Sequence, residues 1–126
     1  MLLRSNGMEI IMAKFERRLT GDYDKFLNYI HKSVLSGSIS ASFQGGSDFN
    51  VEGVRCAVRV YERYSVIGSN RLAANITLLG VGDELHLSVI TSGGSQAVFF
   101  KINTFGEEAF ADKIARIVNR WTQKYC

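Results

Sequence analysis

The chain of 126 residues contains no proline and only two cysteines, and each shortage excludes a class of protein. Average usage would place about six prolines in a chain of this length, so proline-rich ligand segments and rigid proline linkers are excluded. The 12 glycines, with asparagine, aspartate and serine, must therefore form the turns. Cys56 and Cys126 stand outside any C-x-x-C motif or histidine cluster. Their placement argues against a metal or redox site and suits a reducing cytoplasm.

Long hydrophobic runs and clusters of positive charge are missing as well. No stretch approaches the roughly 20 apolar residues of a membrane span, and the opening residues MLLRSNGMEII are too short an apolar segment for a signal peptide. The net charge is +3, but the 15 basic residues form no run. We therefore predict a cytoplasmic protein with no membrane partner, and nucleic acid is not an expected partner because its binding needs clustered charge.

Apolar and polar residues alternate through the middle of the chain, which predicts strands with one buried face. An edge strand is expected over residues 12–19, and Gln44–Asp48 is expected to be a loose loop. In the run that begins at Val54, the even-numbered residues are assigned to the buried face and the odd-numbered residues to solvent. The predicted strands after the first are 39–43, 54–63, 71–78, 84–90 and 96–102.

Two amphipathic helices bracket these strands. The first follows the N-cap Asp22, and the second follows a capping box that begins at Thr104. The order β-α-β(about 5)-α predicts an α+β two-layer sandwich, in which both helices pack on an antiparallel meander. The arrangement resembles the helix-grip and TATA-binding-protein-like folds, an analogy that carries no function.

Residues 12–126 are expected to form a single domain. Residues 1–11 are assigned to an N-terminal extension, and three interpretations of it stay open. It is a disordered remnant of expression, an over-extended start, or a genuine first strand, because Met8 and Met12 both offer alternative starts.

The strongest candidate for ligand binding is a stripe of three arginines, each four residues from the next on one strand, with a tyrosine between two of them. Neighbouring arginines stand roughly 13 Å apart, and guanidinium groups beside a stacking ring are typical of sites for phosphate-bearing ligands. An anionic ligand is therefore possible. The alternatives are structural ion pairs on an exposed face, or a dimer surface. The candidate residues, including those expected on the neighbouring strands, are Arg55, Arg59, Tyr61, Arg63, Arg71, Asn75 and His86.

Two functions are considered, and neither is enzymatic. The first is a binding or regulatory protein that acts through a sheet surface, with a second copy of itself in a homodimer or another protein as its partner, since apolar residues occupy positions expected to face solvent. The second is a carrier of a small apolar or anionic molecule, with a cavity between the sheet and the C-terminal helix. No catalytic residue, metal ligand or cofactor is predicted. The apolar positions expected in solvent are Ala57, Tyr61, Ala73, Leu79, Ile90 and Phe99, and the cavity would be lined by Phe100, Phe110, Ile114 and Trp121.

Three runs of sequence resemble a known family. MAKFE at 12–16, VRCAVRVYERYS at 54–65 and TSGGSQAVFFKINTFGEE at 91–108 are similar to a family of small bacterial proteins classed only as a domain of unknown function. The likeness covers Met12 to Trp121. It implies a stand-alone cytoplasmic bacterial protein, and it brings no activity, cofactor or catalytic residue.

Overall fold

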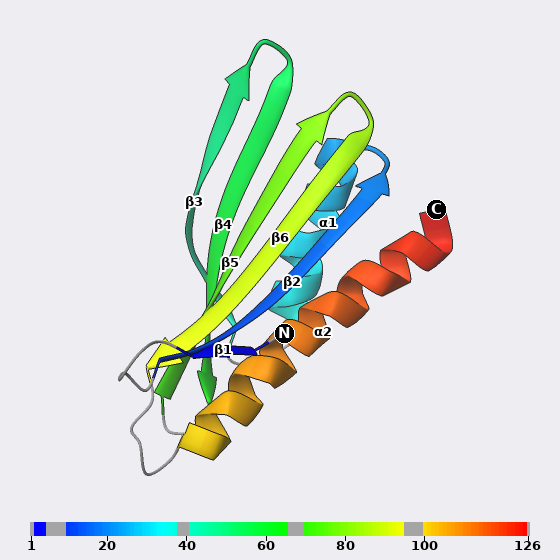
Figure 1. The fold of residues 1–126 in the computed structure, drawn as a ribbon. Helices are drawn as coiled ribbons and strands as arrows, with labels where there is room; N and C mark the ends of the chain where they lie inside the picture. The colour runs from blue at the N-terminus through cyan, green and yellow to red at the C-terminus, as the bar shows by residue number, and fades with distance from the viewer. Residues whose placement is uncertain (1, 5–9, 38–40, 66–69, 95–99, 126) are drawn as a thin grey trace.

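A computed structural model describes residues 2–4, 10–37, 41–65, 70–94 and 100–125 of the chain. Six strands form one antiparallel sheet in the order β1-β2-β6-β5-β4-β3, and two helices accompany it (Figure 1). The elements are β1 (Leu2–Arg4), β2 (Ile10–Thr20), α1 (Tyr23–Ser36), β3 (Ser42–Val51), β4 (Val54–Ser65), β5 (Asn70–Val81), β6 (Glu84–Gly94) and α2 (Phe100–Tyr125). The predicted α+β class and element order are confirmed.

The helices cover one face of the sheet and leave the other face open. α2 lies against β2, β6 and β5, and it also contacts α1. Phe26 of α1 and Trp121 of α2 stack with their ring centroids 5.4 Å apart. The Tyr29 hydroxyl of α1 donates a hydrogen bond of 2.5 Å to the Ile117 carbonyl of α2. The two helices therefore form one layer over the sheet.

α1 forms where the sequence predicts it. The side chain of Asp22 accepts a hydrogen bond of 2.9 Å from the backbone N–H of Lys25, which satisfies a donor that the first helical turn leaves free. The apolar stripe of α1 is buried against the sheet. It starts with Tyr23, which packs so closely on Gly80 of β5 that an added Cβ would lie 2.5 Å from the tyrosine ring. The stripe consists of Tyr23, Phe26, Ile30 and Val34.

The core lies between this helical layer and the sheet. The predicted inward faces of β5 and β6 are confirmed, and so is that of β2 for Ala13 and Leu19. The apolar residues at every second position from Leu72 to Leu78 and from Leu85 to Val89 explain this agreement, because the residues between them are mostly polar. The buried strand residues of β5 and β6 are Leu72, Ala74, Ile76, Leu78, Leu85, Leu87, Val89 and Thr91.

The predicted faces of β4 are wrong. Ala57 and Tyr61 are 0% exposed and face the helices, whereas Val58 and Val60 lie half-buried on the open face. β4 carries Ala57 and Tyr61 on the face of its arginines and valines on the other, so alternation indicates two faces but does not settle which of them is buried. Pairing with β5 makes the choice, because Ala57 stands opposite Leu78 and shares its face.

Two segments also differ from the expected local structure. Gln44–Asp48 belongs to β3, where a register shift between Phe43 and Gly45 absorbs one extra residue as a β-bulge. Residues 100–102, expected to end a strand, lie in α2, which begins at Phe100 and so continues through Thr104. β6 already pairs with β5 and β2, so a strand that followed it could not join as its neighbour. The expected strand residues 96–99 fall outside the described part of the chain.

The variants Ala57→Asp and Val58→Asp should show which face of β4 is buried, because they should differ in stability. Ala57→Asp places an unpaired charge beneath the helices, which costs several kcal/mol out of the roughly 5–15 kcal/mol that stabilises a domain. We expect this variant to lose its cooperative thermal transition in far-ultraviolet circular dichroism. Val58→Asp should keep the transition with a loss of about 1 kcal/mol. Greater damage from Val58→Asp would contradict this assignment of the faces.

Candidate functional site

The predicted arginine stripe faces the helices, where its members are engaged. The guanidinium of Arg55 donates hydrogen bonds of 2.9 and 2.8 Å to the two carboxylate oxygens of Asp24 on α1. It also lies 4.1 Å from the ring centroid of Tyr23. The hydrogen bond from Arg55 holds the pKa of Asp24 below its usual value. Because this pair is exposed, it contributes little to stability.

Arg59 is the most enclosed of the ion-paired arginines, with a side chain 18% exposed. One guanidinium nitrogen donates to the carbonyls of Val58 and Ser47, at 3.0 and 3.3 Å. The other donates to Asp48 at 2.9 Å. Gly46 on β3 makes room for this side chain, since an added Cβ would lie 3.0 Å from it. Arg59 is therefore held in place by β3.

Tyr61 links the stripe to α1. Its hydroxyl lies 2.8 Å from Nδ1 of His31, whose ring meets Phe43 edge-on at 5.2 Å. Burial raises the pKa of Tyr61 to about 12, so the phenol keeps its proton at neutral pH. Arg63, the last member of the stripe, lies over the ring of Phe110 at 5.4 Å.

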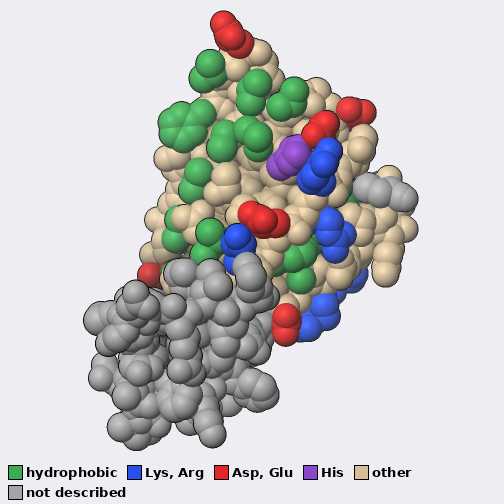
Figure 2. All heavy atoms as spheres, in the orientation of Figure 1, with side chains coloured by type: hydrophobic (Ala, Val, Ile, Leu, Met, Phe, Trp, Pro, Cys, Tyr) green, Lys and Arg blue, Asp and Glu red, His purple; other side chains and the backbone are tan. Residues whose placement is uncertain are grey.

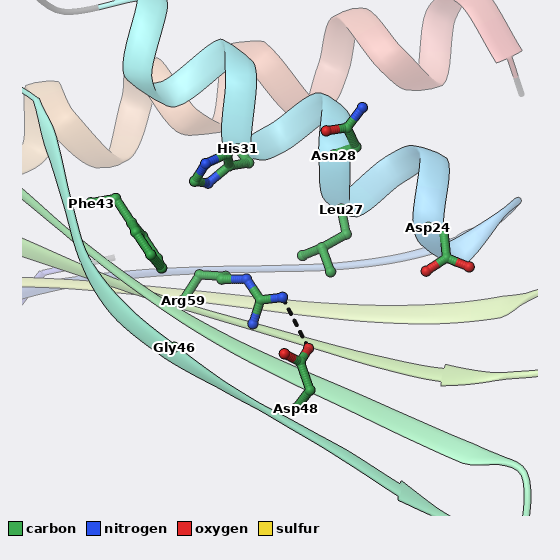
Figure 3. Close-up of a pocket in the computed structure, with 8 residues that line it drawn as sticks. All are labelled: Asp24, Leu27, Asn28, His31, Phe43, Gly46, Asp48 and Arg59. Carbon is green, nitrogen blue, oxygen red and sulfur yellow. Dashed lines mark hydrogen bonds and ion pairs between the residues drawn. The ribbon is translucent and has the colours of Figure 1, made fainter.

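A groove of about 510 Å³ opens between α1 and β3, with Arg59 on its floor (Figure 3). It exists because β3 extends the sheet beyond the strands that α1 covers. Its walls carry apolar groups at one end and carboxylates at the other. The lining residues are Asp24, Leu27, Asn28, His31, Phe43, Gly46, Asp48 and Arg59.

The remaining predicted site residues lie on the open face of the sheet. Arg71 pairs with Glu62 at 3.1 Å, and Asn75 accepts a hydrogen bond of 3.4 Å from Thr77. His86 lies 2.6 Å from Glu84, and this hydrogen bond is the main cause of a lowered pKa of Glu84. The structure thus divides the predicted set between two faces.

The open face carries a hydrophobic surface, and the sequence interpretation placed its β4 residues, Val54, Cys56, Val58 and Val60, in the core. We call it the open-face patch. Figure 2 shows its hydrophobic atoms gathered on one part of the face, beside the histidine and charged side chains. A turn over Glu52-Gly53, both with positive φ, brings its strands together. The patch consists of Phe49, Val51, Val54, Cys56, Val58, Val60, Leu79 and Val81.

The apolar residues predicted to face solvent are exposed in some cases and buried in others. Leu79 and Ile90 are exposed as expected, and Ala73 is half-buried. Ala57 and Tyr61 are buried, for the reason given for β4. Phe99 lies outside the described residues. The two-residue turn at Glu52-Gly53 could have predicted that the residues before it pair with those after it, but not which face of this hairpin is exposed.

The residues proposed to line a carrier cavity are packed in the core. Phe110, Ile114 and Trp121 belong to one buried cluster with side chains of α1 and the sheet. The side chain of Phe100 is not among those described. In the described part of the chain, no three histidine, cysteine, aspartate or glutamate side chains gather to hold a metal ion. Over the same residues, neither helix is long and apolar enough to cross a membrane.

These features define an α+β protein with one face of its sheet covered by helices and the other face open. The chain belongs to a family of unknown function, DUF6054, whose model matches residues 12–122. The predicted resemblance to a family of unknown function is confirmed.

The chain is similar in fold to a solved structure. It is the crystal structure of PA94, a protein of unknown function from Pseudomonas aeruginosa that is described provisionally as a regulator. The two chains are 10% identical with a TM-score of 0.50, over 86% of this chain and 92% of the other. At this identity the likeness shows the fold alone. No curated protein matches the chain.

Arg59→Gln and Arg71→Gln should differ in their effect on stability. Arg59→Gln leaves a carboxylate and two carbonyls without their enclosed charged donor, which should cost roughly 1–3 kcal/mol in urea unfolding. Arg71→Gln, at an exposed pair, should change the free energy of unfolding by less than about 1 kcal/mol. Equal small effects would show that the stripe is not structural and would favour a role in binding anions.

Tyr61 should make stability fall at alkaline pH. Below pH 10 both the folded and unfolded states hold its proton, so this group adds no pH dependence. Between the unfolded value of 10.0 and the folded value of about 12, the unfolded chain loses the proton first, and stability falls as the pH rises. The urea midpoint of the wild type should therefore decline more steeply from pH 9.5 to 11.5 than that of Tyr61→Phe. Parallel profiles would contradict the raised pKa.

Proposed function

We propose that this protein is a non-catalytic binding or regulatory protein that acts through the open face of its sheet, and that its partner there is a second copy of the chain. The open-face patch carries the proposal. Phe49 and Val51 are 58% and 65% exposed, and Val81 on β5 is 50% exposed. Exposed apolar surface of this extent is typical of interaction sites on monomers.

The register makes the patch continuous. Val51, Val54 and Val81 form one row across three strands, and Phe49, Cys56 and Leu79 form the next. Neighbouring strands lie about 4.8 Å apart, so the side chains within each row are in contact range. The patch is therefore a single surface that one partner could cover.

The charges around the patch favour a second copy as that partner. Among the described strand residues, three cations, Lys14, Arg18 and Arg71, and three anions, Glu16, Glu62 and Glu84, project from the open face. Their sum is zero, whereas the whole chain carries +3. In a two-fold dimer each surface meets itself, so a face of balanced charge does not repel its copy. A hydrophobic centre with a mixed polar rim is also the usual anatomy of an interface.

We further propose that the protein works in the bacterial cytoplasm. Cys56, the free thiol among the described residues, lies half-buried on the open face. A reducing compartment keeps such a thiol from forming disulfides between copies. The carrier function is a weaker candidate, because Phe110, Ile114 and Trp121, which would line its cavity, fill the core instead.

Light scattering coupled to gel filtration tests the dimer. At tens of micromolar, the wild type should elute with twice its mass of 14.0 kDa. The double variant Phe49→Ser with Leu79→Ser should elute as a monomer with its thermal transition kept, because both side chains are exposed.

The control for this experiment is Tyr125→Ser, which removes an equally exposed aromatic ring from the end of α2. This variant should stay dimeric. A monomeric wild type at these concentrations would overturn the proposal, as would a double variant that remains a dimer.

A further inference from the structure

β3 ends the sheet, and its outer edge meets no other strand among those described. Alternate residues of an antiparallel edge strand turn their N–H and C=O groups outward, ready to pair with another chain. Proteins usually protect such edges with lysine, proline or short strands. β3 is ten residues long, and its sequence SFQGGSDFNV contains no proline, lysine or arginine. Its bulge is confined to Phe43–Gly45, and Gly46–Val51 pairs with β4 in unbroken register.

The helix-facing side of the same edge opens into the groove beside α1 (Figure 3). Phe43, Gly46 and Asp48 face this side, as their partners Tyr61, Arg59 and Ala57 show. The Phe43 ring is exposed. Gly46 has no side chain of its own, and the Arg59 side chain lies over it, 3.0 Å from where a Cβ would stand. An added strand would therefore find the Phe43 ring and the aliphatic stem of Arg59 on this side.

Asp48 supplies the charge preference of the groove. The guanidinium of Arg59 is occupied by two carbonyls and by one oxygen of Asp48. The second oxygen of Asp48 accepts no hydrogen bond from the described residues, and the side chain is 66% exposed. The second oxygen of Asp48 can therefore still accept a hydrogen bond, which suits a lysine or arginine on the ligand.

We propose that the β3 edge binds an extended peptide segment of another protein by antiparallel strand addition. The segment carries a lysine or arginine opposite Asp48 and apolar side chains opposite Gly46 and Phe43. Main-chain hydrogen bonds supply the affinity, and the alternate side chains that enter the groove supply the specificity. A second copy is the poorer occupant of this edge, because β3 offers no cation to pair with Asp48.

The probe is a fluorescein-labelled heptapeptide with blocked ends and the sequence TKTLTLT, compared with its lysine-to-glutamate counterpart TETLTLT. Fluorescence anisotropy with the full chain should show saturable binding of the lysine peptide, about fivefold tighter than the glutamate peptide at low salt. Equal binding of the two peptides, or no binding of either, would overturn the proposal.

Backbone methylation tests the hydrogen-bonded ladder. N-methyl groups are placed either on the three threonines that follow the lysine, at positions 3, 5 and 7 of the peptide, or on the lysine and the two leucines, at positions 2, 4 and 6. Only alternate peptide N–H groups face β3, so one methylated series should lose binding and the other should keep it. If both methylated series still bind, strand addition is excluded.

Neighbouring residues of β3 provide matched variants. Asp48→Lys should reverse the preference, so that the glutamate peptide binds more tightly than the lysine peptide. This reversal is a gain that a folding defect could not produce. Phe49→Ser, on the opposite face of the strand, should leave peptide binding unchanged. If Phe49→Ser weakens the peptide and Asp48→Lys does not reverse its preference, the peptide binds the open-face patch and the edge proposal fails.

Discussion

The pairing of β4 with β5 is the constraint on which the other surface features depend. From Leu72 to Leu78 every second residue of β5 is apolar and buried, so this face lies beneath the helices. β4 has apolar residues on both faces and takes its orientation from this neighbour. With Tyr61 opposite Ala74, the arginines of β4 face the two helices and its valines face outward. A slip of one residue would exchange the two surfaces and bury the valines in place of the arginines.

The unequal sizes of the two layers produce the remaining surfaces. The described chain has six strands but only two helices to cover them. α2 lies over β2, β6 and β5, and α1 places Tyr23 on β5. β3 extends the sheet beyond the helices, so a groove remains between its inner face and α1, with Arg59 on its floor. As the last strand of the described sheet, β3 also has a free outer edge. The open-face patch follows from the absence of a second helical layer among the described residues.

The candidate site could be predicted only in part, because its three arginines share one strand but contact partners on different elements of the fold. The spacing of the arginines along β4 was visible in the sequence. Their carboxylate partners were not, since Asp24 lies on α1 and Asp48 on β3. Long-range pairs of this kind depend on how the helices and strands pack together. The alternation of residues along one strand carries no information about that packing. For the same reason the sequence could not show that Arg71 and His86 lie on the open face, opposite the arginine stripe that they were expected to extend.

The sequence by itself determined the class of the fold, the first helix and its cap, and the buried faces of β5 and β6. These features depend on local periodicity and on contacts between residues close in the chain, such as Asp22 with Lys25. Only the tertiary structure decided the orientation of β4, the strand character of Gln44–Asp48 and the helix that begins at Phe100. In each case the local preference was divided or weak. For β4 the deciding contact was its pairing with β5, and for Gln44–Asp48 it was the pairing with β4. The helix from Phe100 forms because β6 has no free neighbour position for another strand.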